Sequence, residues 1–171
     1  MKVYLGTDHA GFELKEKVKA VLLEKKYDVE DCGAFTFDKN DDYPDFIGKA
    51  ADAVSKNPEN FGIVFGGSGQ GEAIVANKYP GIRCSLFYAP VIPPEAMDIA
   101  GNTSTDPFEM LALTRAHNDS NMLSLGARFL TTEDAIKAVL VFLESPFSED
   151  ERHVRRIEKV KKIEELLDKE R

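Results

Sequence analysis

The sequence lacks the residue groupings that most metal and disulfide proteins need. Its 171 residues include two cysteines, Cys32 and Cys84, which form no CxxC pair, and three histidines with no metal-ligand spacing among themselves or with a cysteine. We therefore predict no metal site, although the adjacent Asp8 and His9 are the candidates if one exists. The cysteines are expected to be free thiols in a reducing compartment, with one disulfide as the alternative.

Long apolar runs are also missing, and so is a positive charge excess. No segment approaches transmembrane length, and the first residues do not have the layout of a signal peptide. The net charge of −8 argues against non-specific binding to nucleic acid or to an anionic membrane. The sequence therefore predicts a cytoplasmic protein with neither kind of partner.

What the chain does contain is the pattern of one α/β domain spanning residues 1–171. Hydrophobic residues make up 43% and charged residues 30%, as in ordinary globular proteins. Short apolar runs predict strands at 3–6, 27–31, 61–65, 82–87 and 121–126. Helical periodicity predicts helices at 12–26, 44–55, 72–78, 108–117 and 131–143, and a C-terminal helix at about 149–170. This alternation predicts a parallel sheet with helices on both faces.

The central feature is a glycine-rich loop between the third strand and the next helix. It reads Gly66-Gly67-Ser68-Gly69-Gln70-Gly71-Glu72. Glycines let the backbone come close to a ligand, and a carboxylate beside an anion cradle suggests proton transfer next to a developing oxyanion. The loop fits neither a Walker motif, a dinucleotide fingerprint nor a nucleophile elbow. A tight turn without chemistry is the alternative.

Other polar residues are expected near this loop or on the last helix. Asp8 and His9 follow the first strand, so they should share the carboxyl edge of the sheet with the loop. Arg152 and Arg156 lie four residues apart on one helix face and suit a phosphate, unless they form a solvated surface. His117 is either functional or a helix C-terminal residue favoured by the dipole.

Several motifs, in order along nearly the whole chain, resemble the type B ribose-5-phosphate isomerases, relatives of the galactose-6-phosphate isomerase subunits. They are Gly6-Thr7-Asp8-His9-Ala10-Gly11-Phe12-Glu13-Leu14-Lys15, Asp42-Tyr43-Pro44-Asp45, Ala76-Asn77-Lys78, Gly81-Ile82-Arg83, His117-Asn118-Asp119, Leu125-Gly126-Ala127-Arg128 and Arg152-His153-Val154-Arg155-Arg156. One branch of the family uses a cysteine as base at the position of Gly66. This sequence resembles the other branch, in which the glutamate of Gly-Gly-Ser-Gly-x-Gly-Glu is the base.

The resemblance implies a fold and an activity. The fold is a three-layer, flavodoxin-like, doubly wound domain with a five-stranded parallel sheet. The activity is a cofactor-free aldose–ketose isomerisation of ribose 5-phosphate and ribulose 5-phosphate through an enediolate, within the pentose phosphate pathway. The assembly is a homodimer, or a tetramer, with active sites between subunits.

The resemblance also implies a role for each matching residue. Glu72 would be the base, and His117 would help to open the furanose ring. The groups that hold the enediolate and the sugar would be the backbone of the loop glycines, Ser68, two polar side chains and a tyrosine: Gly67, Gly69, Gly71, Ser68, Asp8, Asn118 and Tyr43. The phosphate set would be His9, Arg128, Arg152 and Arg156, contributed by two subunits.

One segment departs from the family pattern. Between Cys84 and His117 the chain carries more residues than the family usually does, and the surplus is an inserted, proline-rich loop at about 89–107. We expect this loop to border the active site and to narrow the range of accepted sugars. Two alternatives stay open: the isomerase of another sugar phosphate (a tetrose, allose or galactose 6-phosphate) and a non-catalytic phospholigand-binding module.

Overall fold

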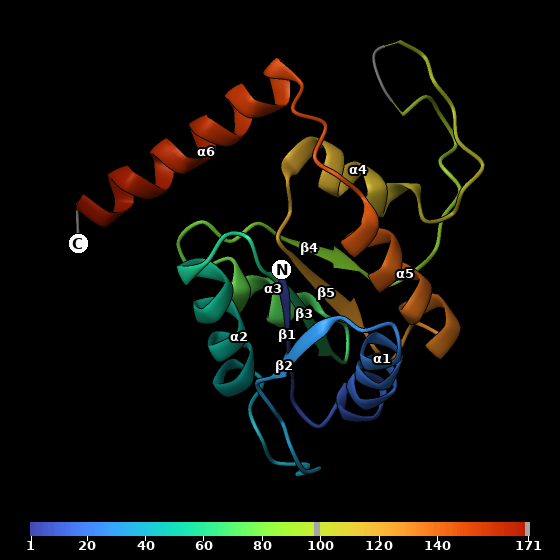
Figure 1. Cartoon of the computed structure of the whole chain (residues 1–171), viewed down its shortest axis with the longest axis vertical. Helices are drawn as coiled ribbons and strands as arrows, with labels where there is room; N and C mark the ends of the chain where they lie inside the picture. The colour runs from blue at the N-terminus through green and yellow to red at the C-terminus, as the bar shows by residue number, and fades with distance from the viewer. Residues whose placement is uncertain (98–99, 170–171) are drawn as a thin grey trace.

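The five apolar runs form five parallel strands in the computed structural model, which describes residues 1–97 and 100–169 (Figure 1). The strands are β1 (Lys2–Thr7), β2 (Asp28–Asp31), β3 (Phe61–Gly66), β4 (Cys84–Phe87) and β5 (Met122–Gly126). Every residue of β5 is buried, as expected of a strand covered on both faces. The predicted α/β class and the five-stranded parallel sheet are confirmed.

The order of the strands across the sheet is β2-β1-β3-β5-β4. The flavodoxin order is 2-1-3-4-5, so the last two strands are exchanged here. The exchange places β5 beside β3, with Gly66 level with Gly126 at their carboxyl ends. It also makes β4 an edge strand.

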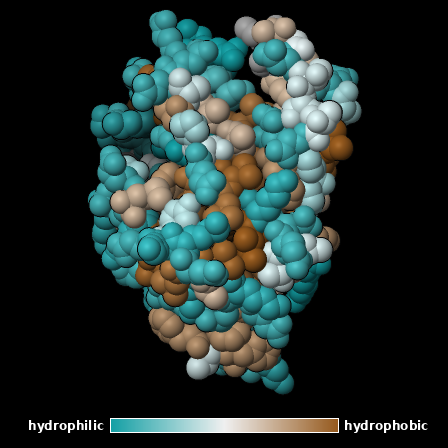
Figure 2. Space-filling model, turned by 45° about the vertical axis from the view of Figure 1, so that its right-hand side comes forward, coloured by the Kyte–Doolittle hydropathy of each residue, from teal (hydrophilic) through white to brown (hydrophobic). Residues whose placement is uncertain are grey.

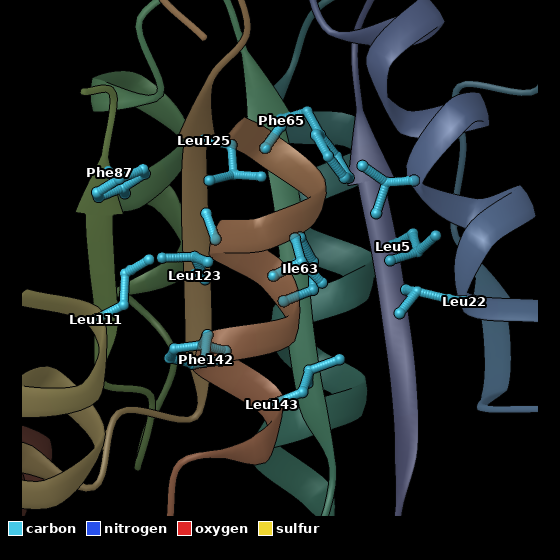
Figure 3. Close-up of a cluster of buried hydrophobic side chains, with 14 of the residues drawn as sticks. Leu5, Leu22, Ile63, Phe65, Phe87, Leu111, Leu123, Leu125, Phe142 and Leu143 are labelled. Carbon is cyan, nitrogen blue, oxygen red and sulfur yellow. The ribbon is translucent and has the colours of Figure 1, made fainter. Parts of the chain in front are cut away.

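Helices cover both faces of the sheet and enclose the core between themselves and the strands. One face carries α1 (Phe12–Glu24), α4 (Glu109–Asn118) and α5 (Thr132–Glu144), and the other carries α2 (Pro44–Lys56) and α3 (Gln70–Ala76). On the first face, Leu5, Ile63 and Leu125 of the strands meet Leu22 of α1 and Phe142 of α5 (Figure 3). The paired layers hold the carboxyl ends of the strands in place.

A buried ion pair fixes the loop between β2 and α2. Lys15 is fully buried, and its Nζ donates to Asp31 Oδ1 at 2.7 Å and to the Ala34 carbonyl at 2.6 Å. The Ala34 N–H in turn donates to the Thr7 carbonyl at the end of β1. The loop that leads to the start of α2 is thereby tied to the carboxyl edge of the sheet.

The C-terminal helix α6 (Glu151–Lys169) extends away from the sheet in Figure 1. It presents an open apolar stripe, in which Val160, Ile163 and Leu167 are 49%, 58% and 54% exposed. The sequence predicted a helix to residue 170, which lies outside the described residues. Within the described part of the chain, none of the helices combines the length and the apolar character needed to cross a membrane.

The proline-rich insertion also stands away from the body of the protein. It leaves the end of β4 and returns to α4, and residues 98 and 99 within it lie outside the described residues. Figure 2 shows this loop at the upper right, with hydrophobic surface in the middle of the face below it. Val91 and Ile92 are 62% and 56% exposed.

Candidate active site

The glycine-rich loop joins β3 to α3 at the carboxyl edge of the sheet, as the sequence predicts. Gly69 adopts a positive φ of 78°, and a Cβ there would lie 2.7 Å from Leu86 Cδ1 and 3.0 Å from the backbone of Leu125. Its carbonyl accepts a 2.6 Å hydrogen bond from Ser124 Oγ. Only glycine fits this position, and the bond to β5 fixes the loop in shape.

Glu72 lies in the first turn of α3 and is only 4% exposed. A Cβ built on Gly66 would lie 1.9 Å from Glu72 Cδ, so the carboxylate occupies the space that a side chain at residue 66 would need. Burial raises the pKa of Glu72, the negative charge of Asp8 raises it further, and the residue's own N–H opposes both effects. Burial therefore outweighs the pKa-lowering effect that a helix start has on a carboxylate.

Asp8 is held beside Glu72 by the end of β1. Its Oδ1 accepts a 2.9 Å hydrogen bond from the Ala10 N–H, and its side chain is buried. The preceding Thr7 donates from its hydroxyl to the Phe65 carbonyl at 2.9 Å. This bond ties the carboxyl ends of β1 and β3 together, so the two carboxylates belong to one site.

Two more predicted residues close over the glycine loop. A Cβ on Gly71 would lie 2.8 Å from the Tyr43 Oη, and a Cβ on Gly67 would lie 3.3 Å from the guanidinium of Arg128. Ser68 lies between these glycines, and its hydroxyl accepts a long hydrogen bond of 3.4 Å from the Gln70 N–H. The structure thus brings Tyr43, Arg128 and Ser68 to the same edge as Glu72.

His9 completes this edge and lies within a group of acidic side chains. One ligand atom each from Asp8, His9 and Asp41 lie within 4.8 Å of one another, a grouping from which a metal site could be built. The contact of His9 Nδ1 with Asp41 Oδ1 is 2.7 Å, the length of a charge-assisted hydrogen bond. We therefore describe the group as a hydrogen-bonded cluster in which that ring nitrogen is already engaged. Sequence reasoning did not single out Asp41.

The remaining predicted residues lie elsewhere, at the end of α4 and the start of α6. His117 stacks on His153 with ring centroids 4.2 Å apart. Burial lowers the pKa of His117, and His153, Arg152 and Arg156 lower it further. Asn118 and Arg156 border the same cavity of about 320 Å³. This second cluster combines a histidine whose pKa is lowered with cations suited to an anion.

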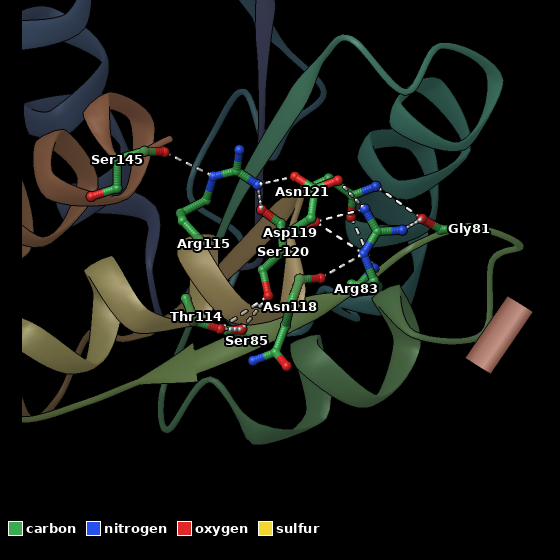
Figure 4. Close-up of polar contacts among 10 residues, drawn as sticks. All are labelled: Gly81, Arg83, Ser85, Thr114, Arg115, Asn118, Asp119, Ser120, Asn121 and Ser145. Atoms are coloured by element: carbon green, nitrogen blue, oxygen red, sulfur yellow. Dashed lines mark hydrogen bonds and ion pairs between the residues drawn. The ribbon is translucent and has the colours of Figure 1, made fainter. Parts of the chain in front are cut away.

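Two arginines hold the chain immediately after Asn118 (Figure 4). Asp119 adopts the left-handed conformation with φ 45°, and its carboxylate accepts from Arg83 at 2.9 Å and from Arg115 at 2.7 Å. Arg83 also donates to the Asn118 carbonyl. Arg115 is buried with its guanidinium 4.8 Å from the Phe61 ring centroid. This clamp fixes where α4 ends, and hence where His117 lies.

The two clusters lie toward opposite ends of the strands. The glycine loop and Glu72 follow the carboxyl end of β3, whereas α4 and α5 run back to the amino edge before β5 and α6 begin. In Figure 1 the arrow of β5 points away from α6. A parallel strand of five residues is about 15 Å long. The topology therefore places His117, Asn118, Arg152 and Arg156 toward the end of the strands opposite to the glycine loop.

The chain is similar to known proteins of one family. A profile of the Ribose/Galactose Isomerase family matches residues 3–94 and 99–160. The chain is 41% identical over 158 residues to ribose-5-phosphate isomerase B of Mycolicibacterium paratuberculosis, covering 92% of this chain and 88% of the relative. It is 32% identical over 164 residues to ribose-5-phosphate isomerase B of Escherichia coli K12, covering 96% and 97%.

Solved structures of proteins with similar sequences also have a similar fold. Ribose-5-phosphate isomerase B of Mycoplasma genitalium, solved with bound ribulose 5-phosphate, superposes with a TM-score of 0.83 at 34% identity and 96% coverage of both chains. The enzyme of the same name from Thermotoga maritima gives a TM-score of 0.78 at 38% identity, covering 94% of this chain and 97% of the other.

The burial of Glu72 predicts a pH-dependent cost in stability. Because its pKa is raised in the folded state, folding becomes less favourable as the pH rises above the ordinary glutamate pKa of about 4.3. Glu72→Gln should therefore unfold at a higher Tm than the parent by a few degrees at neutral pH, and the difference should vanish near about pH 4. Glu59→Gln, at an exposed turn, is the control and should change neither. A lower Tm for Glu72→Gln than for the parent at neutral pH would contradict the predicted cost in stability.

Proposed function

Because the chain belongs to the ribose/galactose isomerase family, we propose that it interconverts ribose 5-phosphate and ribulose 5-phosphate with Glu72 as the base. The predicted isomerase activity is confirmed by the relatives, which are ribose-5-phosphate isomerases B. The choice of base rests on one observation: the Glu72 carboxylate is buried against Gly66 at the end of the glycine loop.

The proposed reaction moves one proton between neighbouring carbons. The Glu72 carboxylate takes the proton from C2 of the open-chain aldose, and the electron pair of that C–H bond forms the C1–C2 double bond of an enediolate. Negative charge collects on O1. Return of the proton to C1, with transfer of the O2 hydroxyl proton to O1, gives the ketose. Atoms and electrons balance within the sugar, so acid–base groups suffice.

The environment of Glu72 suits this task. A carbon acid is weak, so a carboxylate with a raised pKa is a better base than an exposed one. Burial and the charge of Asp8 supply that increase in pKa. We assign the enediolate oxygen to the backbone N–H groups of Gly67, Gly69 and Gly71 with Ser68 alongside. Their support is the fixed shape of the loop beside the carboxylate. Asp8 binds a sugar hydroxyl, and Tyr43 lines the pocket.

The phosphate and the ring-opening step require the second cluster. We assign His117, Asn118, Arg152 and Arg156 to the site of a second copy of the chain. There they join His9 and Arg128, and the enzyme is a homodimer. The separation of the two clusters along the strands and the open apolar stripe of α6 support this assignment. The pKa of His117 is lowered, so a neutral imidazole is available to take the proton of the anomeric hydroxyl.

We place the enzyme in the cytoplasm. Both cysteines are free in the structure: Cys32 lies in the loop after β2, and Cys84 is the first residue of β4. Burial raises the pKa of the Cys32 thiol to about 11, so it stays protonated at physiological pH. Unreactive, unpaired thiols suit a reducing compartment.

Replacing the base tests the reaction directly. Glu72→Gln keeps the shape of the side chain but cannot accept the proton, so kcat should fall by about 10²–10⁴-fold. Binding of inorganic phosphate, measured by calorimetry, should stay unchanged because the phosphate set is intact. Glu59→Gln is again the control. A kcat close to that of the parent would remove Glu72 as the base.

Mixing two inactive variants tests whether sites lie between subunits. Glu72→Gln and His117→Ala should each be inactive alone. After the two are unfolded together and refolded, random pairing makes half of the dimers mixed, and each mixed dimer has one intact site. Activity should therefore recover to about a quarter of the parent value. No recovery, with mixed dimers demonstrated by differently tagged chains, would place both residues in the site of one chain.

We also propose that the insertion borders the sugar site and restricts the substrate range. Tyr88 at its start packs on Phe129, with ring centroids 6.1 Å apart, beside the loop that carries Arg128. Replacing residues 89–107 by a short glycine linker should change kcat/KM differently for pentose and hexose phosphates while leaving the Glu72 chemistry intact. Equal relative kcat/KM for every sugar, together with a monomeric protein, would make the loop a subunit contact instead.

A further inference from the structure

We propose that Asp41 is a positioning residue that holds His9 as a cation with its free ring nitrogen directed at the substrate phosphate. The inference rests on the proposed function, because it assumes that His9 binds the phosphate. It adds a residue that carries none of the assigned roles. Its basis is the way one carboxylate oxygen engages His9 twice, together with the burial of that carboxylate.

A single oxygen of Asp41 fixes both the backbone and the ring of His9. Asp41 Oδ1 accepts from the His9 N–H at 2.9 Å and contacts His9 Nδ1 at 2.7 Å. Because Asp41 Oδ1 contacts both the backbone and the ring of His9, the imidazole ring is held in one orientation. Nδ1 carries the proton that faces the carboxylate, so Nε2 is the nitrogen left to act. Nε2 can donate to an anion only when the ring is charged, because a neutral imidazole has one N–H.

The charges around His9 favour the charged ring. Asp41 has the largest effect in raising the His9 pKa, and Asp8, 3.8 Å from Nδ1, raises it too. Burial and Arg128 act against this increase. On the α1 side, Glu13 and Lys17 line the same hollow as His9 with opposite charges. The net direction is upward, so the imidazolium persists to a higher pH than in an exposed histidine.

The Asp41 carboxylate is in turn stabilised by the charged ring of His9. Its side chain is 10% exposed, and Oδ2 is fully enclosed without a hydrogen-bond partner in the part of the chain that the structure describes. An ionised carboxylate in such a place is costly unless an opposite charge is near. Within residues 1–97 and 100–169, the ion pair of Asp41 within 4 Å is the one with His9. The pair is therefore complete only while His9 is charged.

The neighbouring residue offers a matched control. Asp42 carries the same charge one position along the chain, but its side chain is exposed. Both carboxylates lie in the loop that the Lys15 ion pair ties to the sheet edge. Asp41→Asn and Asp42→Asn therefore remove the same charge from the same loop, and only the first removes the acceptor for His9.

The first measurement is the pKa of His9 by NMR in the unliganded protein. The chain has three histidines, and His9→Gln identifies the His9 signal. In the parent, the pKa should lie above the ordinary value of about 6.5. Asp41→Asn should lower it by about one unit or more, Asp41→Glu should restore part of the loss, and Asp42→Asn should change it by less than about 0.3. A parent pKa at or below the ordinary value overturns the proposal even if Asp41→Asn fails to fold.

The second measurement is the affinity for sulfate, a dianion that does not titrate in this range. Between about pH 6 and pH 8.5, Asp41→Asn should lose affinity steeply as the pH rises, by about tenfold relative to the parent at the upper end. Asp42→Asn should follow the parent. If the His9 pKa falls in Asp41→Asn while sulfate affinity keeps the parent's pH profile, the charge is not used for binding and the proposal is wrong.

His9→Gln separates this inference from the function on which it rests. It should bind sulfate weakly at every pH, as Asp41→Asn does at high pH. If His9→Gln binds sulfate as well as the parent, His9 is not in the phosphate set, and the proposed binding role fails together with this inference. If His9→Gln has no effect on sulfate binding but turnover still depends on Glu72, the isomerase assignment remains intact.

Discussion

In a parallel sheet, each connecting helix must return the chain from the carboxyl ends of the strands to their amino ends. The arrangement of this protein follows from that constraint. The glycine loop with Glu72 is at the carboxyl edge, whereas α4 and α6 present His117 and the arginines near the amino edge. Under the proposed function, each chain therefore holds two half-sites, and each half is completed by another copy.

Burial and a few charged neighbours shift the pKa values of three titratable groups in different directions. Burial beside Asp8 raises the pKa of Glu72, which suits a base. Carboxylates raise the pKa of His9, which suits an anion-binding cation. Burial and neighbouring cations lower the pKa of His117, which suits a neutral proton acceptor. The pKa values of two histidines of the same chain are thus shifted in opposite directions by their surroundings.

The sequence predicted the strands and the glycine loop because apolar runs and glycines leave local patterns. It could not predict the exchange of β4 and β5, because strand order depends on long-range packing that short patterns do not record. Glu72 was found from its place after the loop, but the direction of its pKa required its burial to be known. Asp41 and the Arg83–Asp119 clamp were missed, because irregular loops have no periodicity that indicates which side chains meet.

The space at Gly66 also limits which side chain could stand there. A cysteine at this position, as the resemblance implies for the other branch of the family, would place its Cβ 1.9 Å from Glu72 Cδ. Under the proposed function, a thiol introduced at residue 66 would displace the Glu72 carboxylate, and loss of the carboxylate alone would leave no base. In this chain the two side chains exclude each other sterically, so one base could replace the other only if both residues changed together.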